Sequence, residues 1–554
     1  MSRLACLVLL CVLAGACTPE PDNDAGAERP RLEAGTSEAG SEPVATLEGG
    51  RAVVATTEPP TLNPWLASPD SGVGMIVRPM LAPLWRVRPD GTFEPWLLAG
   101  EPTVAGGDDE PFSVTYRIRD DAVWSDGQPI DGRDVLFTLE TCLRTAPRAD
   151  CTAVDLERSQ AAGKQVTVVF TRPTATWRTV LSSMPVLPEH ELRGRELATM
   201  WTWQISVSSG PFRFGSWTPG ERLVLVRNDN WWGEPPPLDS IDFRFTGDAA
   251  VAEVAEGMVD VAWLPASPAL VDQARAEPRV RARIETGRRW AALDFNVASS
   301  ALQDPQVRRA LAQAIDRATI VAELIQPVDP DAGAPAQWPG GPAPADDQAP
   351  MFPEHDVRGA ARALDAAGCP VGSDGIRVCD DQRMELDLVT TEDDWQQPIV
   401  GEYVQSQLAE LGVDVRYARP PGGAPSQDTT ESTGQATSWD LRITAVPAAA
   451  DLTISANRWR CDHPANTQSF CDTQFDATVQ AAAETLDSQQ RAELDNEAVL
   501  LLSRELPTYP LYEVPAMVVH ASTITGPAPN PGPWGPTWNV EQWVQIADEM
   551  PSGD

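Results

Sequence analysis

One stretch, residues 116–140, contains a strand-like alternation, a tight turn and the start of a helix. The Ser-Asp-Gly sequence at 125–127 predicts the turn, because Gly accepts positive φ and the other two side chains can bond their own backbone. Asp131 then stands at an N-cap position, and Asp134 adds a second carboxylate near the positive end of the helix. The apolar residues of the helix expected over 132–145 share one face: Val135, Leu136, Leu139 and Leu143. This order predicts local structure but no chemistry.

The length of the chain and its charge limit what it can be. Its 554 residues exceed one comfortable core, so two or three lobes are expected. The formal net charge of −38 argues against nucleic acid and anionic membrane surfaces as partners. Lys164 is the only lysine, which we interpret as codon bias of a GC-rich genome.

Three long motifs resemble those of the family 5 solute-binding proteins, the extracytoplasmic receptors of ABC importers. The first, YRIRDDAVWSDGQPIDGRDVLFTLE at 116–140, is similar to F-x-L-R-x-x-x-x-W-x-D-G-x-P followed by x-x-D-V-x-F-[ST]-L. The second, at 209–233, resembles G-T-G-P-[YF] continued by L-x-R-N-x-x-Y-W. The third, VRRALAQAIDR at 307–317, resembles V-R-x-A-[LI]-x-x-A-[IL]-D-R. A shorter match, Glu58 to Pro64, is similar to E-P-x-T-L-[DN]-P.

The resemblance implies an α/β fold of the two-lobed, type II periplasmic-binding-protein (Venus-flytrap) class, with an enlarged first lobe. It implies the following division: signal peptide 1–16, disordered tether 17–46, lobe I 47–290 with an extra subdomain at about 85–205, lobe II 291–507, a return to lobe I at 508–545, and a disordered tail 546–554.

Several elements are predicted from local signals. Asp304 before Pro305 predicts the start of a helix over 305–325. The last strand is expected over 509–512. A β-α-β unit with parallel strands is predicted from a strand at 384–389, a helix at 395–411 and a strand at 413–417.

The N-terminus predicts export and lipid attachment. Arg3, an apolar run at 4–13 and the sequence Ala-Gly-Ala before Cys17 are typical of a signal peptide followed by a lipobox. Cys17 would become the lipidated N-terminus, although lipoboxes usually carry Leu where Ala14 stands. Plain secretion is the alternative. The tether after Cys17 would span about 30 Å. We therefore expect an extracytoplasmic protein held to the membrane by its lipid alone, in the periplasm or on the outer cell surface.

Nine cysteines divide by position. Cys6 and Cys11 would leave with the signal peptide, and Cys17 would carry the lipid. Outside the cytoplasm the other six are expected to oxidise, and among 15 possible pairings we choose the local one. That pairing joins Cys142 to Cys151, Cys369 to Cys379, and Cys461 to Cys471. A metal site at Cys461, His463 and Cys471 is the alternative, but it lacks a clear fourth ligand.

The resemblance also suggests ligand-binding residues. Peptide binders of the family commonly hold the peptide amine with a carboxylate shortly after a [YW]-D-L strand, which corresponds to residues 439–441 here. Asp451 is the only acid between Ile443 and Arg458, so we predict it as the amine anchor, with a helix N-cap or surface acid as the equal alternative. The other candidates for the cleft are Trp439, Trp459 and Glu58, although a buried Trp is more often core. No arginine stands out as a carboxylate binder; Arg442, Arg458 and Arg460 only lie in the right stretch.

The expected function is capture of peptides for delivery to ABC permease subunits, by a monomer without a cofactor. The same receptor class also binds oligosaccharides, nickel chelates or opines, and 19 Trp residues would suit sugar stacking. A secreted hydrolase is the remaining alternative, since 80 acids could include a catalytic pair. However, the sequence contains no G-x-S-x-G, no H-E-x-x-H and no phosphate loop, and we predict no catalytic and no metal-binding residue.

Overall fold

The computed structural model describes residues 46–66, 72–107, 110–145, 151–182, 184–246, 250–342, 350–390, 395–418, 439–447, 451–530 and 535–547. The expected signal peptide, Cys17, the tether up to residue 45 and residues 548–554 lie outside these ranges. Among the described helices, none has both the length and the apolar character that a membrane crossing needs.

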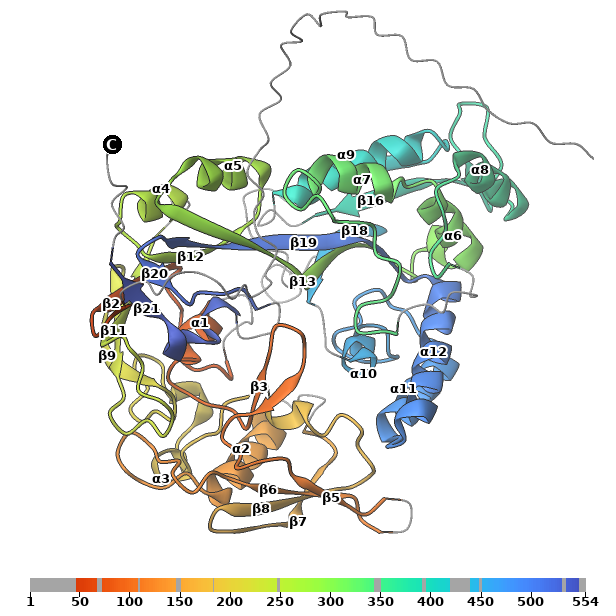
Figure 1. Cartoon of the computed structure of the whole chain (residues 1–554). Coiled ribbons are helices and arrows are strands. Elements are labelled where there is room, and N and C mark those ends of the chain that lie inside the picture. Colours follow the sequence, from red (N-terminus) through yellow and green to blue (C-terminus); the bar gives the residue numbers. More distant parts are fainter. Residues whose placement is uncertain are drawn as a thin grey trace, which may run out of the picture.

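A ten-stranded sheet runs through the molecule (Figure 1). In spatial order its strands are β17 (Asp414–Ala418), β16 (Glu385–Val389), β18 (Leu441–Pro447), β13 (Val280–Phe295), β19 (Thr508–Ala521), β12 (Val261–Pro265), β2 (Arg51–Thr56), β11 (Ser240–Phe245), β10 (Arg222–Arg227) and β9 (Phe212–Thr218).

Smaller sheets surround it. A four-stranded sheet has the order β5 (Thr103–Ala105), β6 (Ser113–Arg117), β8 (Gln165–Phe170), β7 (Val154–Ala162). The other small sheets are β3 (Trp85–Val87) with β4 (Phe93–Pro95), β14 (Val378–Cys379) with β15 (Gln382–Arg383), and β1 (Thr46–Leu47) with β21 (Val544–Ile546) and β20 (Ile524–Thr525).

The helices are distributed around these sheets. Their bounds are α1 (Val73–Val77), α2 (Gly132–Thr145), α3 (Glu189–Leu192), α4 (Ala250–Ala255), α5 (Pro268–Ala276), α6 (Pro305–Gln313), α7 (Arg317–Leu324), α8 (Val357–Ala366), α9 (Gln396–Ala409), α10 (Leu452–Ser455), α11 (Thr473–Glu484) and α12 (Ser488–Glu505). Helix α2 packs on β7 and β8, and α11 packs on α12.

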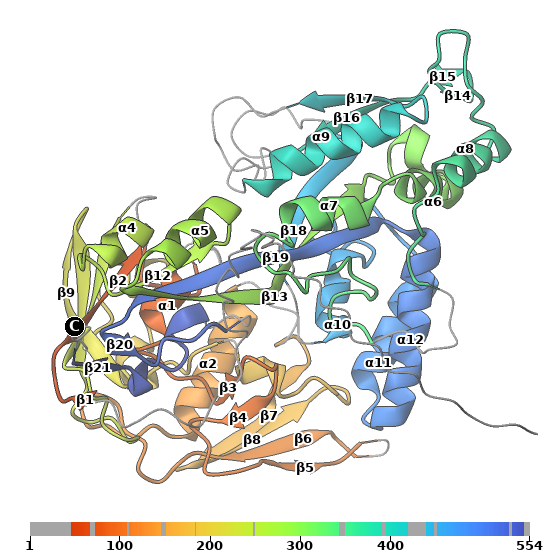
Figure 2. The same ribbon diagram turned by 45° about the horizontal axis from the view of Figure 1, so that its top comes forward.

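Two long antiparallel strands, β13 and β19, join two hydrophobic cores (Figure 2). The first core draws on residues 52–280 and 517–543, with Val328 added, and the second on residues 290–512. Each long strand leaves one core and enters the other. Their register shifts between Glu285 and Arg289, where three residues of β13 face the single residue Pro515. Proline has no N–H to donate, which suits such a bulge.

The predicted β-α-β unit is confirmed, since β16 and β17 pair in parallel on either side of α9. The single helix predicted over 305–325 is wrong. Asp304 caps α6 as expected, but Asp316 accepts a second cap bond, from the N–H of Thr319 at 3.0 Å, and starts α7. The last strand was also predicted too short and is not the last, because β19 spans 14 residues and is followed by β20 and β21. Its Pro510 and Pro515 interrupt the local strand signal.

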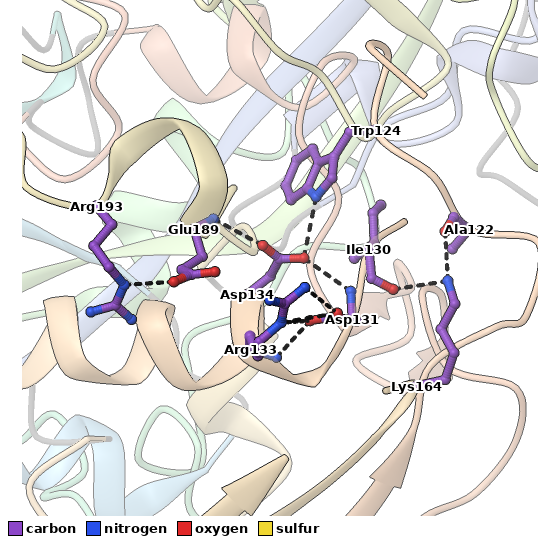
Figure 3. A network of polar contacts seen from close by, with 9 residues as sticks. All are labelled: Ala122, Trp124, Ile130, Asp131, Arg133, Asp134, Lys164, Glu189 and Arg193. Carbon is purple, nitrogen blue, oxygen red and sulfur yellow. Dashed lines mark hydrogen bonds and ion pairs between the residues drawn. The ribbon is translucent and has the colours of Figure 1, made fainter. Parts of the chain in front are cut away.

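The predicted turn and capped helix form a polar network at the start of α2 (Figure 3). Asp131 caps α2 by accepting from the N–H of Arg133 at 2.8 Å. Asp134 returns the contact, accepting from the N–H of Asp131 at 2.9 Å, from the N–H of Glu189 at 2.8 Å and from the indole of Trp124 at 3.2 Å. Burial raises the pKa of Asp134, while these donors favour its charged form.

Lys164 has a structural place in the same network. Its ammonium donates to the carbonyl oxygens of Ala122 at 2.7 Å and Ile130 at 2.9 Å, which fastens both ends of the turn (Figure 3). Burial lowers the pKa of Lys164, although the negative charges of the surrounding aspartates act in the opposite direction.

The structure contains the three disulfides of the predicted local pairing, Cys142–Cys151, Cys369–Cys379 and Cys461–Cys471. With both sulfurs of the last pair in a disulfide, neither can serve as a thiolate ligand. Among the described residues, no group of three His, Cys, Asp or Glu side chains could hold a metal ion.

Candidate functional site

A cavity of about 510 Å³ lies between segments that belong to the two cores. One wall comes from β5 and from the segment after β8, the other from the starts of α10 and α12. The lining residues are Val104, Ala175, Trp177, Arg178, Asp451, Leu486, Ser488, Arg491, Ala492 and Asp495. Its volume falls within the range of about 300–1,000 Å³ that is usual for small-ligand sites.

The two walls touch beside the cavity. The N–H of Ala175 donates to the carbonyl oxygen of Ala483 at the end of α11, at 2.8 Å. Next to it, Arg172 and Glu484 approach to 3.5 Å as an exposed ion pair. A second, smaller cavity of about 70 Å³ lies at this contact, and Arg460 contributes to its lining. Noncovalent contacts therefore hold the two walls together at this point.

Asp451 lines the cavity, but its carboxylate already has partners. One oxygen accepts from the N–H of Thr453 at 2.9 Å and from the Thr453 hydroxyl, which makes Asp451 the N-cap of α10. The other oxygen forms an ion pair with the guanidinium of Arg491. The N-cap alternative is thus present in the structure, and the role of amine anchor stays a prediction.

Asp495 lies one turn of α12 beyond Arg491. Its Oδ2 atom is 3.8 Å from Nε of Arg491, too far for a hydrogen bond. Its Oδ1 atom is buried and has no hydrogen-bond partner among the described residues. Burial raises the pKa of the Asp495 carboxyl, and Arg491 only partly opposes this shift.

The opposite wall is aromatic and cationic. Arg178 lies over the ring of Trp177, 4.3 Å from its centroid, and pairs with Glu101 at 3.1 Å. Val104 and Leu486, which line the cavity from opposite walls, are each 43% exposed. The cavity therefore combines apolar surface with charged groups.

The other predicted ligand residues lie outside this cavity. Glu58 is exposed and accepts from the indole of Trp217 at 3.1 Å and from the N–H of Gly220 at 3.0 Å. The side chain of Trp439 is half-buried beneath Arg442, whose guanidinium is 4.6 Å from the ring centroid. Trp459 has no exposed surface and donates to the hydroxyl of Thr508 at 3.0 Å, so this arrangement places it in the core. Their contact with ligand stays a prediction.

Two of the arginines near the predicted anchor pair with a buried acid instead. Arg442 and Arg458 both bind the carboxylate of Asp294, which is completely buried. Burial alone would raise the pKa of Asp294, but the two arginines outweigh it and hold the pKa below its usual range. Both guanidiniums are therefore engaged by one carboxylate, which compensates one of their two positive charges.

Comparison with known proteins assigns the family. The family described as "Bacterial extracellular solute-binding proteins, family 5 Middle" matches residues 92–455, more than half of the chain. The chain belongs to this family.

Its curated relatives include oligopeptide-binding proteins. Protein XP55 of Streptomyces lividans is 32% identical over 60% of this chain, which spans 59% of that protein's length. The oligopeptide-binding protein AppA of Bacillus subtilis is 24% identical over 75% of each chain. The oligopeptide-binding protein OppA of Mycobacterium tuberculosis is 27% identical, over 75% of this chain and 71% of the relative.

Solved structures share the fold. A periplasmic EDTA-binding protein, EppA, has a TM-score of 0.79 at 23% identity, over 91% of this chain and 98% of its own. AppA of Bacillus subtilis, in complex with a nonapeptide, has a TM-score of 0.73 at 20% identity, over 91% and 100%. The type II periplasmic-binding-protein fold is thereby established for this solute-binding protein.

Of the lining residues, sequence analysis predicted only Asp451 and missed the aromatic and charged ones of this family 5 protein: Trp177, Arg178, Arg491 and Asp495. They lie in no motif, and Arg491 is 40 residues from Asp451 in the sequence. The one available signal was the i, i+4 spacing of Arg491 and Asp495, which indicates that both share a helix face but not what that face contacts.

Proposed function

We propose that this chain is the extracytoplasmic substrate-binding lipoprotein of an ABC importer, which captures peptides between its lobes and delivers them to the permease. The observation that carries the proposal is the cavity whose walls come from both cores. A ligand that contacts both walls favours the conformation in which they meet.

Closure by a hinge is part of the proposal. The register shift between Glu285 and Arg289, opposite Pro515, interrupts both long strands where they pass between the cores. We place the hinge there, with lobe I at 47–290 and the return 508–545, and lobe II at 291–507. Few ladder bonds would need to change at such a bulge when the lobes move.

Peptide is the proposed cargo because relatives named for oligopeptide binding align over three-quarters of this chain. A peptide main chain can be held by strand-like hydrogen bonds, with its amine toward the end of the cavity where Asp451 and Asp495 flank Arg491. Oligosaccharides and metal chelates remain the alternative cargoes. We further propose that the chain is not an enzyme.

Lipid attachment at Cys17, a monomeric state and anchoring by the lipid alone complete the proposal. An uncharacterized lipoprotein of Mycobacterium leprae is 24% identical over 81% of this chain, which supports the anchor. Palmitate labelling of the wild type but not of Cys17→Ser would test it.

Native mass spectrometry of the protein from residue 46, expressed under oxidising conditions, tests the cargo. Additional masses that resolve into short peptides after denaturation support the proposal. An unliganded mass that does not change when peptide pools are added contradicts it, and sugars and metal chelates are then added to the same protein. A missing mass of six hydrogens would verify the three disulfides.

A further inference from the structure

The charges around the cavity are not equally balanced. Arg178 is paired with Glu101, and Arg491 is paired with Asp451. Asp495 is left with only the 3.8 Å approach of Arg491. Among the described lining residues, Asp495 therefore carries the negative charge with the least compensation.

The burial of Asp495 makes this imbalance costly. A buried carboxylate oxygen without a donor has lost its hydration and received no hydrogen bond in return. The raised pKa of Asp495 has this cause. A cation in the cavity would supply the opposite charge, and it would supply the donor once the Asp495 side chain turns this oxygen toward it.

We propose that Asp495, rather than Asp451, receives the cationic group of the bound solute, a primary ammonium or a guanidinium. Arg491 pairs with Asp451 at the start of α10, and the cation binds next to this ion pair. This inference rests on the proposed function and names the charge that the ligand must carry.

The other lining groups fit a ligand with an apolar body behind its charge. Val104 and Leu486 present exposed apolar surface from opposite walls, and the largely buried Trp177 adds a small aromatic area. Such a ligand would bury its apolar part between the walls while its cation reaches α12. A free peptide N-terminus next to an apolar first residue meets this description.

The test compares ligand charge and protein charge together. A tetrapeptide pool with free N-termini and the same pool after Nα-acetylation are titrated into the wild type and into Asp495→Asn. Glu493→Gln is the matched control, because it removes one charge from an exposed position of the same helix. Thermal unfolding of each variant shows that all are folded.

The wild type and Glu493→Gln are expected to prefer the free pool by about tenfold or more, the size of a hydrogen bond to a charged group. Asp495→Asn should lose this preference and keep its binding of the acetylated pool. If Asp495→Asn keeps the full preference, the inference is wrong. Loss of the preference in Asp451→Asn alone would return the role to Asp451.

A second arm separates this inference from the proposed cargo. If neither peptide pool binds the wild type, the same proteins are titrated with agmatine and cadaverine. Binding that disappears in Asp495→Asn would support the cation site and contradict only the peptide assignment. Absence of binding of either amine, or binding that does not depend on Asp495, overturns the inference.

Discussion

The N–H of Ala175 donates a hydrogen bond to the carbonyl oxygen of Ala483, which joins the segment after β8 to the end of α11. This contact can exist only while the cavity walls meet. Both side chains are small and uncharged, so a substitution that removes this bond changes the contact between the walls and little else.

Ala175→Pro removes this donor and should weaken ligand binding about fivefold, because a typical net hydrogen bond contributes about 1 kcal/mol. The dissociation constant for a peptide found by native mass spectrometry is the measurement. Ala175→Gly retains the N–H and is the matched control. Equal affinity of the two variants would mean that the contact does not contribute to closure.

The buried ion pairs of Asp294 should control acid stability. Asp294→Asn leaves Arg442 and Arg458 without their shared carboxylate, and loss of one partner of a buried pair costs about 3–5 kcal/mol. Because the pKa of Asp294 is lowered in the folded protein, its stabilisation is complete at neutral pH. It is lost as the pH falls below about 3.9 and through the folded-state pKa.

Denaturant unfolding at pH 7 and at a series of lower pH values measures both effects for Asp294. Asp120→Asn is the matched control, because its ion pair with Arg117 is exposed and should contribute less than about 1 kcal/mol. A loss in Asp294→Asn no greater than that of the control would contradict the assigned role of the buried carboxylate.

Local signals predicted much of the fold. The turn at 125–127, the Asp131 cap and the apolar face of α2 need only neighbouring residues, and the structure contains all three. The break between α6 and α7 was missed because the apolar periodicity continues across it, while the second cap at Asp316 is a signal of a single residue. Residues 280–288 of β13 were missed because charged residues interrupt the apolar pattern there.

The candidate site could be predicted only in part. Asp451 was found through its distance from a motif, and the structure places it at the cavity. Its partner Arg491 belongs to a helix whose position depends on packing between α11 and α12, for which the sequence has no short-range signal. The burial of Trp459 is likewise decided by Trp338 and Thr508, both distant in the chain.

At the start of α2, substitution of Asp134 should destabilise the protein more than substitution of the N-cap Asp131. Asp134→Ala leaves three donors without their acceptor, and each such group costs about 1–3 kcal/mol, so a loss of about 3 kcal/mol or more is expected. Asp131→Ala removes an N-cap, which typically costs about 1 kcal/mol. Denaturant unfolding measures the loss of stability in each variant. A larger loss in Asp131→Ala than in Asp134→Ala would contradict the network in Figure 3.

Arg86 should fasten the C-terminal segment to the first core. Its guanidinium is 2.7 Å from Glu541 and 2.9 Å from Glu94, and it is only 5% exposed, so Arg86→Gln should cost about 3–5 kcal/mol. Arg88→Gln is the matched control, because Arg88 reaches the same Glu94 but is half exposed, and it should cost less than about 1 kcal/mol. Burial raises the pKa of Glu541 despite Arg86, so protonation of Glu541 is easier in the folded protein than in the unfolded chain. Without Arg86 this difference should grow, and the deficit of Arg86→Gln in denaturant unfolding should shrink as the pH falls and Glu541 takes up its proton. A deficit that does not change with pH would show that Glu541 does not depend on Arg86 for its charge.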